Sequence, residues 1–117
     1  MKLAVVGSRT FTDYRLLKRK LNWLREYVQI ESIISGGAKG ADSLAESYSI
    51  RYGISFIKIL PDWKKYSKSA GPARNTEIIK RCDFVLAFWD GKSKGTLDSI
   101  NKAKKLNKEV IVVNFNE

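Results

Sequence analysis

Glycines and a lysine are concentrated in the segment 35–42, which reads Ser-Gly-Gly-Ala-Lys-Gly-Ala-Asp. Glycine lets a ligand approach the backbone closely, and the N–H groups at the start of a helix bind anions. An apolar run, 32–34, precedes this segment and an amphipathic stretch, 44–52, follows it. This order of strand, glycine-rich turn and helix predicts a binding site for the phosphate of a nucleotide-like ligand.

A second glycine-bearing helix entrance follows the apolar run 84–89. It contains Gly91, Gly95 and Thr96. Thr96 is explained as a helix N-cap, but the N–H groups beside it also form an anion site. Both junctions are therefore predicted to donate backbone N–H groups to phosphate.

Charged and aromatic side chains near other strand ends could complete this chemistry. Arg9, Lys39 and Arg74 would neutralise phosphate charge, and a ring at Trp63 or Trp89 could stack on a base. The predicted ligand-binding residues are Gly7, Ser8, Arg9, Ser35, Gly36, Gly37, Ala38, Lys39, Gly40, Asp42, Trp63, Arg74, Asn75, Trp89, Asp90, Gly91, Lys94, Gly95 and Thr96.

The elements that must position these residues follow from the apolar runs. Most runs are near-continuous, which is typical of strands buried on both faces of a parallel sheet. The pattern predicts an α/β fold, in which residues 1–117 form a single Rossmann-like three-layer domain with a five-stranded, mainly parallel sheet and helices on both faces. Predicted strands cover 3–6, 32–34, 55–60, 84–89 and 110–115, and predicted helices cover about 13–27, 39–52, 72–81 and 97–106.

The predicted fold brings the special segments together. In a parallel sheet the carboxyl ends of all strands meet at one edge, and ligands bind there where the strand order reverses. Each segment named above follows a predicted strand. Helix ends are predicted at Thr12 and Thr96 as N-caps, at Pro72 as a first helical residue and at Gly53 as the residue that ends the second helix, and 61–71 is predicted to be a long loop.

Composition narrows the class of protein. The net charge of +10 would suit nucleic acid or a small anionic ligand. No apolar run approaches the roughly 20 residues of a membrane span, and the start is too short for a secretory signal. A single cysteine fits a cytoplasmic location, and the lack of histidine argues against a metal site and excludes His-based acid–base catalysis. No cofactor is expected beyond a nucleotide-type ligand.

Two common nucleotide-binding motifs are absent from the sequence. It contains no G-x-x-x-x-G-K-[ST], which disfavours a Walker-type nucleotide hydrolase. It also contains no G-x-G-x-x-G after the first strand, which disfavours an ordinary NAD or FAD site. The phosphate-binding features lie instead after the second and fourth strands.

These segments, together with 6–9, 71–75 and the pattern Asp90-Gly91-x-x-x-Gly95-Thr96, resemble the SLOG superfamily and most closely its YspA/YpsA-like branch. The resemblance covers nearly the whole chain in the right order. It implies a Rossmann-like domain that binds nucleotides or nucleotide-derived ligands such as ADP-ribose. Relatives include the phosphoribohydrolases that release cytokinin bases from nucleoside monophosphates, and DprA, which binds single-stranded DNA.

The enzyme branch of the superfamily carries the pattern Gly-Gly-x-Gly-Thr-x-x-Glu, whose Glu acts with an Arg on the preceding helix. Here Gly95 and Thr96 match, and Arg74 resembles that Arg. Ser99 occupies the Glu position, and Asp98 is a carboxylate one residue early, a shift of about 100° on a helix. Arg74 and Asp98 are thus the catalytic candidates, and this departure weighs against N-glycosidic hydrolysis.

Three functions follow from the sequence. The first is binding of a phosphorylated nucleoside or nucleotide-derived signal. The second is hydrolysis of a nucleoside monophosphate, which predicts release of free base. The third is single-stranded nucleic-acid binding in the manner of DprA, suggested by the charge although the sequence lacks an evident row of exposed aromatics. The resemblance also implies a homodimer or higher homo-oligomer.

Overall fold

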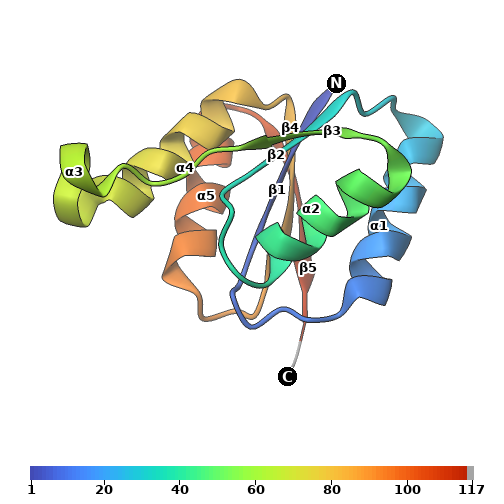
Figure 1. Cartoon of the computed structure of the whole chain (residues 1–117), viewed down its shortest axis with the longest axis horizontal. Coiled ribbons are helices and arrows are strands. Elements are labelled where there is room, and N and C mark those ends of the chain that lie inside the picture. Colours follow the sequence, from blue (N-terminus) through green and yellow to red (C-terminus); the bar gives the residue numbers. More distant parts are fainter. Residues whose placement is uncertain (116–117) are drawn as a thin grey trace.

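A computed structural model describes residues 1–115 and shows five strands in the order β3-β2-β1-β4-β5. Every strand pairing in this sheet is parallel, and helices connect successive strands (Figure 1). The predicted Rossmann-like α/β fold is confirmed. The elements are β1 (Lys2–Gly7), α1 (Tyr14–Tyr27), β2 (Ser32–Ser35), α2 (Ala41–Tyr52), β3 (Ser55–Lys58), α3 (Trp63–Tyr66), a 3₁₀ turn η1 (Ser67–Ser69), α4 (Ala70–Arg81), β4 (Phe84–Trp89), α5 (Lys94–Lys105) and β5 (Glu109–Asn114).

Two apolar cores, one on each face of the sheet, hold the layers together. The alternation of side chains along β1 separates them: Leu3 and Val5 join the core under α1 and α2, whereas Ala4 and Val6 join the core under α4 and α5. Because both faces are covered, β1 and β4 are buried along most of their length. Burial on both faces explains the near-continuous apolar runs in the sequence.

Helix α1 begins later than predicted and α5 begins earlier, because in each case a different side chain caps the helix. The carboxylate of Asp13, not the hydroxyl of Thr12, accepts a hydrogen bond from the Leu16 N–H at the start of α1. Ser93, not Thr96, caps α5 by accepting from the Thr96 N–H. Thr96 therefore lies inside the first turn of α5, where it is buried.

The other predicted boundaries agree in part. Gly53 ends α2 in the left-handed conformation, as predicted. That helix begins at Ala41 rather than residue 39, because Gly40 before it has a φ of 78°. The helix predicted to begin at Pro72 begins two residues earlier, and β3 ends at Lys58 rather than residue 60.

The long loop predicted over 61–71 contains a short projection. We call α3 and η1 together, residues 63–69, the arm. The carboxylate of Asp62 caps α3 by accepting from the Lys65 N–H at 3.1 Å. None of the arm's residues is buried, and the arm projects away from the sheet and from the other helices (Figure 1).

Lysines near the chain's carboxyl end also have specific partners. The ammonium of Lys108 donates to the carbonyls of Ile79, Lys80 and Cys82 at the end of α4. This contact ties β5 to α4. Among residues 1–115, no helix is both long enough and apolar enough to cross a membrane.

Candidate functional site

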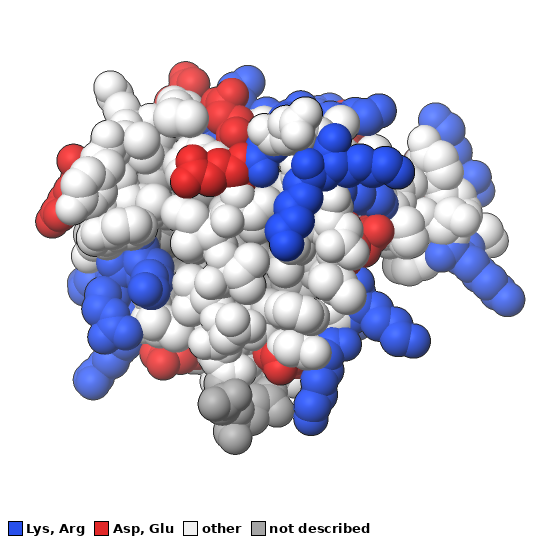
Figure 2. Space-filling model, turned by 180° about the vertical axis from the view of Figure 1, so that it is seen from behind, with Lys and Arg blue, Asp and Glu red and all other residues white. Residues whose placement is uncertain are grey.

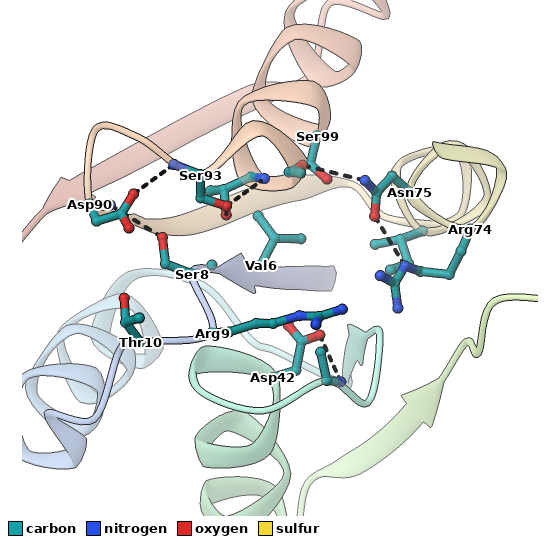
Figure 3. A pocket seen from close by; sticks show the side chains of 15 residues that line it. Val6, Ser8, Arg9, Thr10, Asp42, Arg74, Asn75, Asp90, Ser93 and Ser99 are labelled. Carbon is teal, nitrogen blue, oxygen red and sulfur yellow. Dashed lines mark hydrogen bonds between the residues drawn. The ribbon is translucent and has the colours of Figure 1, made fainter. Parts of the chain in front are cut away.

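An open cavity of ≈ 400 Å³ lies at the carboxyl ends of β1 and β4. The chain leaves β1 toward β2 on one side and returns to β4 on the other, so the cavity lies where the strand order reverses. Four segments far apart in the sequence contribute to its wall (Figure 3). Its lining residues are Val6, Gly7, Ser8, Arg9, Thr10, Ala38, Asp42, Arg74, Asn75, Ile78, Asp90, Ser93, Gly95, Thr96 and Ser99.

Two arginines reach this cavity from opposite sides. Arg9 extends from the loop after β1, Arg74 extends from α4, and their guanidinium groups point toward one another (Figure 3). Burial lowers the pKa of Arg74; the negative charge of Asp42 opposes this effect, and the positive charge of Arg9 adds to it. Two neighbouring cations at one cavity favour an anionic ligand between them.

Hydrogen bonds fix the orientation of Arg74. Its Nη1 donates to the carbonyl oxygen of Gly36 at 2.9 Å, and its Nε donates to Oδ1 of Asn75 at 3.1 Å. The remaining donors of the guanidinium are left for a ligand, since arginine carries five N–H bonds in a planar fork. Arg74 is thus held in place by the glycine-rich turn rather than by a salt bridge.

Asp42 stabilises the glycine-rich turn from inside. Its side chain is only 7% exposed, and its Oδ2 accepts from the Ala38 N–H at 3.1 Å. Burial raises the pKa of this carboxyl, while hydrogen bonds from Ser35 and Ala38 and the charge of Arg74 act in the opposite direction. The sequence suggested a ribose contact or a favourable dipole position for Asp42; its observed partner is the turn itself.

The glycine-rich turn packs tightly against its neighbours. A Cβ at Gly40 would overlap the carbonyl oxygens of Ser8 and Arg9, and a Cβ at Gly36 would overlap the guanidinium of Arg74. The Ala41 N–H also points at the Ser8 carbonyl, at 3.4 Å. These glycines therefore allow the loops after β1 and β2 to approach each other and form one wall of the cavity.

The junction between β4 and α5 is more open. Oδ1 of Asp90 accepts from the Lys92 and Ser93 N–H groups, both at 2.8 Å, and these bonds lower the pKa of the Asp90 carboxyl. A Cβ at Gly91 or at Gly95 would meet no atom within 4 Å. The first turn of α5 therefore faces the cavity with free space in front of it.

Two hydroxyls on α5 also face the cavity. Thr96 and Ser99 lie three residues apart on one face of the helix, and Ser99 is only 2% exposed. Asp98 does not line the cavity. Its Oδ2 accepts from Nδ2 of Asn75 at 3.2 Å and from Nζ of Lys102 at 2.8 Å.

The structure brings together about half of the predicted ligand-binding set. Ser93 and Ser99 were missed, although the three-residue spacing from Thr96 could have revealed Ser99. Trp89 is outside the cavity and donates from Nε1 to the Ser93 carbonyl at 3.1 Å. The cavity is lined by the predicted Gly7, Ser8, Arg9, Ala38, Asp42, Arg74, Asn75, Asp90, Gly95 and Thr96, and not by Ser35, Gly36, Gly37, Lys39, Gly40, Trp63, Trp89, Gly91 or Lys94.

Comparison with known proteins adds three findings. Residues 1–66 match the model of a family described as the YspA, cpYpsA-related SLOG family. The chain is 32% identical over 91 residues to the Gene 61 protein of Mycobacterium phage D29, covering 73% of this chain and 71% of that protein. The X-ray structure of DNA processing protein A (DprA) from Streptococcus pneumoniae has the same fold, with a TM-score of 0.80 at 21% identity; the match covers 98% of this chain but only 50% of the DprA chain.

Proposed function

The chain belongs to the YspA, cpYpsA-related SLOG family, and from this premise we propose that its cavity binds a phosphorylated nucleoside or a nucleotide-derived ligand. The observation that carries the proposal is that Arg9, Arg74 and the first turn of α5 line the same cavity. The cavity volume of ≈ 400 Å³ is within the usual range for small-molecule sites.

The phosphate is proposed to bind at α5 rather than at the glycine-rich turn. The N–H group of Gly95 and the hydroxyls of Thr96 and Ser99 would donate to phosphate oxygens, helped by the positive end of the helix dipole. The Thr96 N–H already donates to Oγ of Ser93. Arg74 would complete the site with charge-assisted hydrogen bonds. The glycine-rich turn supports this arrangement by orienting Arg74.

The base is proposed to make apolar contacts only. The residues that line the cavity include no aromatic side chain, whereas Val6 and Ile78 supply apolar surface. Stacking by Trp63 or Trp89 inside the cavity, as the sequence suggested, has no support from their positions. We therefore expect the phosphate and sugar to contribute most of the affinity.

The hydrogen-bond partners of the nearby carboxylates favour binding of the ligand without hydrolysis. Asp42 and Asp90 line the cavity, but each accepts backbone N–H groups of its own turn. Ser99 occupies the position of the enzyme branch's Glu, and Asp98 is bonded to Asn75 and Lys102. These existing partners of the carboxylates support the proposal of binding without hydrolysis.

Calorimetry against nucleoside mono- and diphosphates, ADP-ribose and inorganic phosphate tests the proposal. Arg74→Ala should weaken binding by about tenfold to a hundredfold, since hydrogen bonds to charged groups contribute about 1.5–3 kcal/mol. Arg81→Ala is the matched control, because Arg81 lies on the same helix and forms a salt bridge with Glu77 on the surface. No binding of any phosphorylated ligand would refute the proposal, and free base released from AMP would replace it with the hydrolase.

A further inference from the structure

The arm exposes two aromatic rings that the fold does not need. Trp63 is 60% exposed and Tyr66 is 41% exposed. They are three residues apart on one helical turn, so they lie on the same side of α3. Neither lines the nucleotide cavity.

The arm is also basic. It carries Lys64, Lys65 and Lys68, and Figure 2 shows this projection at the right of the molecule with basic but no acidic side chains on the visible face. Within residues 1–115, none of these lysines has an acidic side chain within ion-pair distance. Nζ of Lys65 lies 5.1 Å from the centre of the Tyr66 ring, so one cation is close to an aromatic ring.

The lysine charges and the exposed rings of the arm together indicate which kind of molecule it binds. Uncompensated lysines attract a polyanion, and exposed rings stack on bases whose faces are free. A duplex hides those faces, and a second copy of this chain would bring like charges together. We propose that the arm binds single-stranded nucleic acid, with its lysines contacting phosphates and with Trp63 and Tyr66 stacking on bases. This site is separate from the cavity and does not depend on the function proposed there.

Fluorescence anisotropy with a labelled oligothymidylate tests this inference. Trp63→Ala and Tyr66→Ala should each weaken binding about tenfold, as loss of a base–aromatic stack does. Replacing Lys64, Lys65 and Lys68 with Gln should reduce the salt dependence of log K by about 2, since each phosphate contact on a single strand contributes about 0.7. Because the arm buries none of its residues, these variants should fold like the unmodified chain, which circular dichroism can verify.

The matched controls make the same kinds of substitution, Trp to Ala and Lys to Gln, at exposed positions outside the arm. Trp23→Ala removes a ring that is 48% exposed on α1, and Gln at Lys2, Lys104 and Lys105 removes the same charge from other surfaces. Both controls should bind the oligonucleotide within twofold of the unmodified chain.

Several results would overturn the inference. They are unchanged oligonucleotide binding in the arm variants, equal affinity for duplex and single strand, and arm-dependent binding to anionic vesicles in place of the oligonucleotide. A change of oligomeric state in the arm variants, with oligonucleotide binding unchanged, would instead identify a second copy as the occupant.

Discussion

The two glycine-bearing junctions, β2–α2 and β4–α5, differ in what their glycines do. In the first, the backbone is packed against the loop after β1 and against Arg74, and the Ala38 N–H is taken by Asp42. In the second, the glycines face open space and the first turn of α5 lines the cavity. The first junction is therefore packed against other parts of the protein. The second, although Asp90 and Ser93 accept some of its N–H groups, is the junction at which we propose that the phosphate binds.

This difference shows that a glycine after a strand can serve either of two structural purposes. Glycine permits a close approach, but the approaching group can be another part of the protein as well as a ligand. Segment 35–42 has the stronger sequence pattern, yet none of its three glycines lines the cavity. Substitutions at the two junctions can separate these roles.

The largest expected effect is at Gly40. Gly40→Ala should lower the free energy of unfolding by about 2–4 kcal/mol, because it combines a positive φ with overlap against Ser8 and Arg9. Gly91→Ala has a similar φ of 82° but open surroundings, so it should cost only about 1–2 kcal/mol. Urea denaturation of both variants measures the difference, and equal losses would contradict the contrast between the two junctions.

A smaller effect on folding, but a clear one on binding, is expected at Gly36. A Cβ there would overlap the guanidinium of Arg74, which is the flexible end of a side chain and can move away. Gly36→Ala should then cost about 1–2 kcal/mol in stability and weaken phosphorylated-ligand binding roughly tenfold. Calorimetry measures the ligand affinity of this variant and urea denaturation measures its stability. Normal ligand affinity would show that the turn does not orient Arg74.

Gly95→Ala should act in the opposite direction on stability. Gly95 lies in the first turn of α5 with open space around it, so alanine should stabilise the chain by up to about 1 kcal/mol. The added methyl group faces the cavity and should weaken ligand binding severalfold. Gly71→Ala, at an open helical position outside the cavity, is the control that should stabilise without affecting the ligand. Equal ligand affinity in both variants would argue against a phosphate at α5.

The smallest effects are opposite pH dependences at the two junctions. Burial raises the pKa of Asp42 above its ordinary value of 3.8, so its ionisation destabilises the fold as pH rises through the raised pKa. Hydrogen bonds lower the pKa of Asp90, so its contribution is present above pH 3.8 and is lost as pH falls through the lowered pKa.

Comparing Asp42→Asn and Asp90→Asn with the unmodified chain by urea denaturation between about pH 2 and pH 6 separates the two groups. Relative to Asp42→Asn, the unmodified chain should lose stability as pH rises. Relative to Asp90→Asn, it should gain stability over the acidic part of the same range. Slopes of the same sign would contradict the assigned environments of the two carboxyls.

The fold was predictable because the pattern of apolar residues that indicates each strand or helix lies within that element and recurs along the chain. Each buried strand is a near-continuous apolar run, and helices α1, α4 and α5 each have one apolar face. The alternation of strands and helices allows few topologies. Helix starts were less predictable because neighbouring residues compete for one capping position. Thr12 and Asp13 are both good caps, as are Ser93 and Thr96, and only the backbone geometry selects between them.

The site was predictable only where side chains follow strands directly. Arg9 and Asp90 are examples, because parallel strands bring their carboxyl ends together. Whether a backbone N–H is free or already bonded depends on contacts between distant loops, such as the Ala41 N–H with the Ser8 carbonyl. The arm was hidden for a different reason: a short, polar, exposed segment has the composition of a loop.

The absence of buried residues in the arm has a consequence for how this protein can change. A segment that contributes nothing to either core can exchange its side chains freely, because the cost of a substitution arises mainly from packing. New recognition properties can therefore evolve, or be grafted by an engineer, between Asp62 and Ala70 while the rest of the chain stays the same. In this respect the arm resembles the variable loops of a binding scaffold, in which a rigid body presents an interchangeable surface.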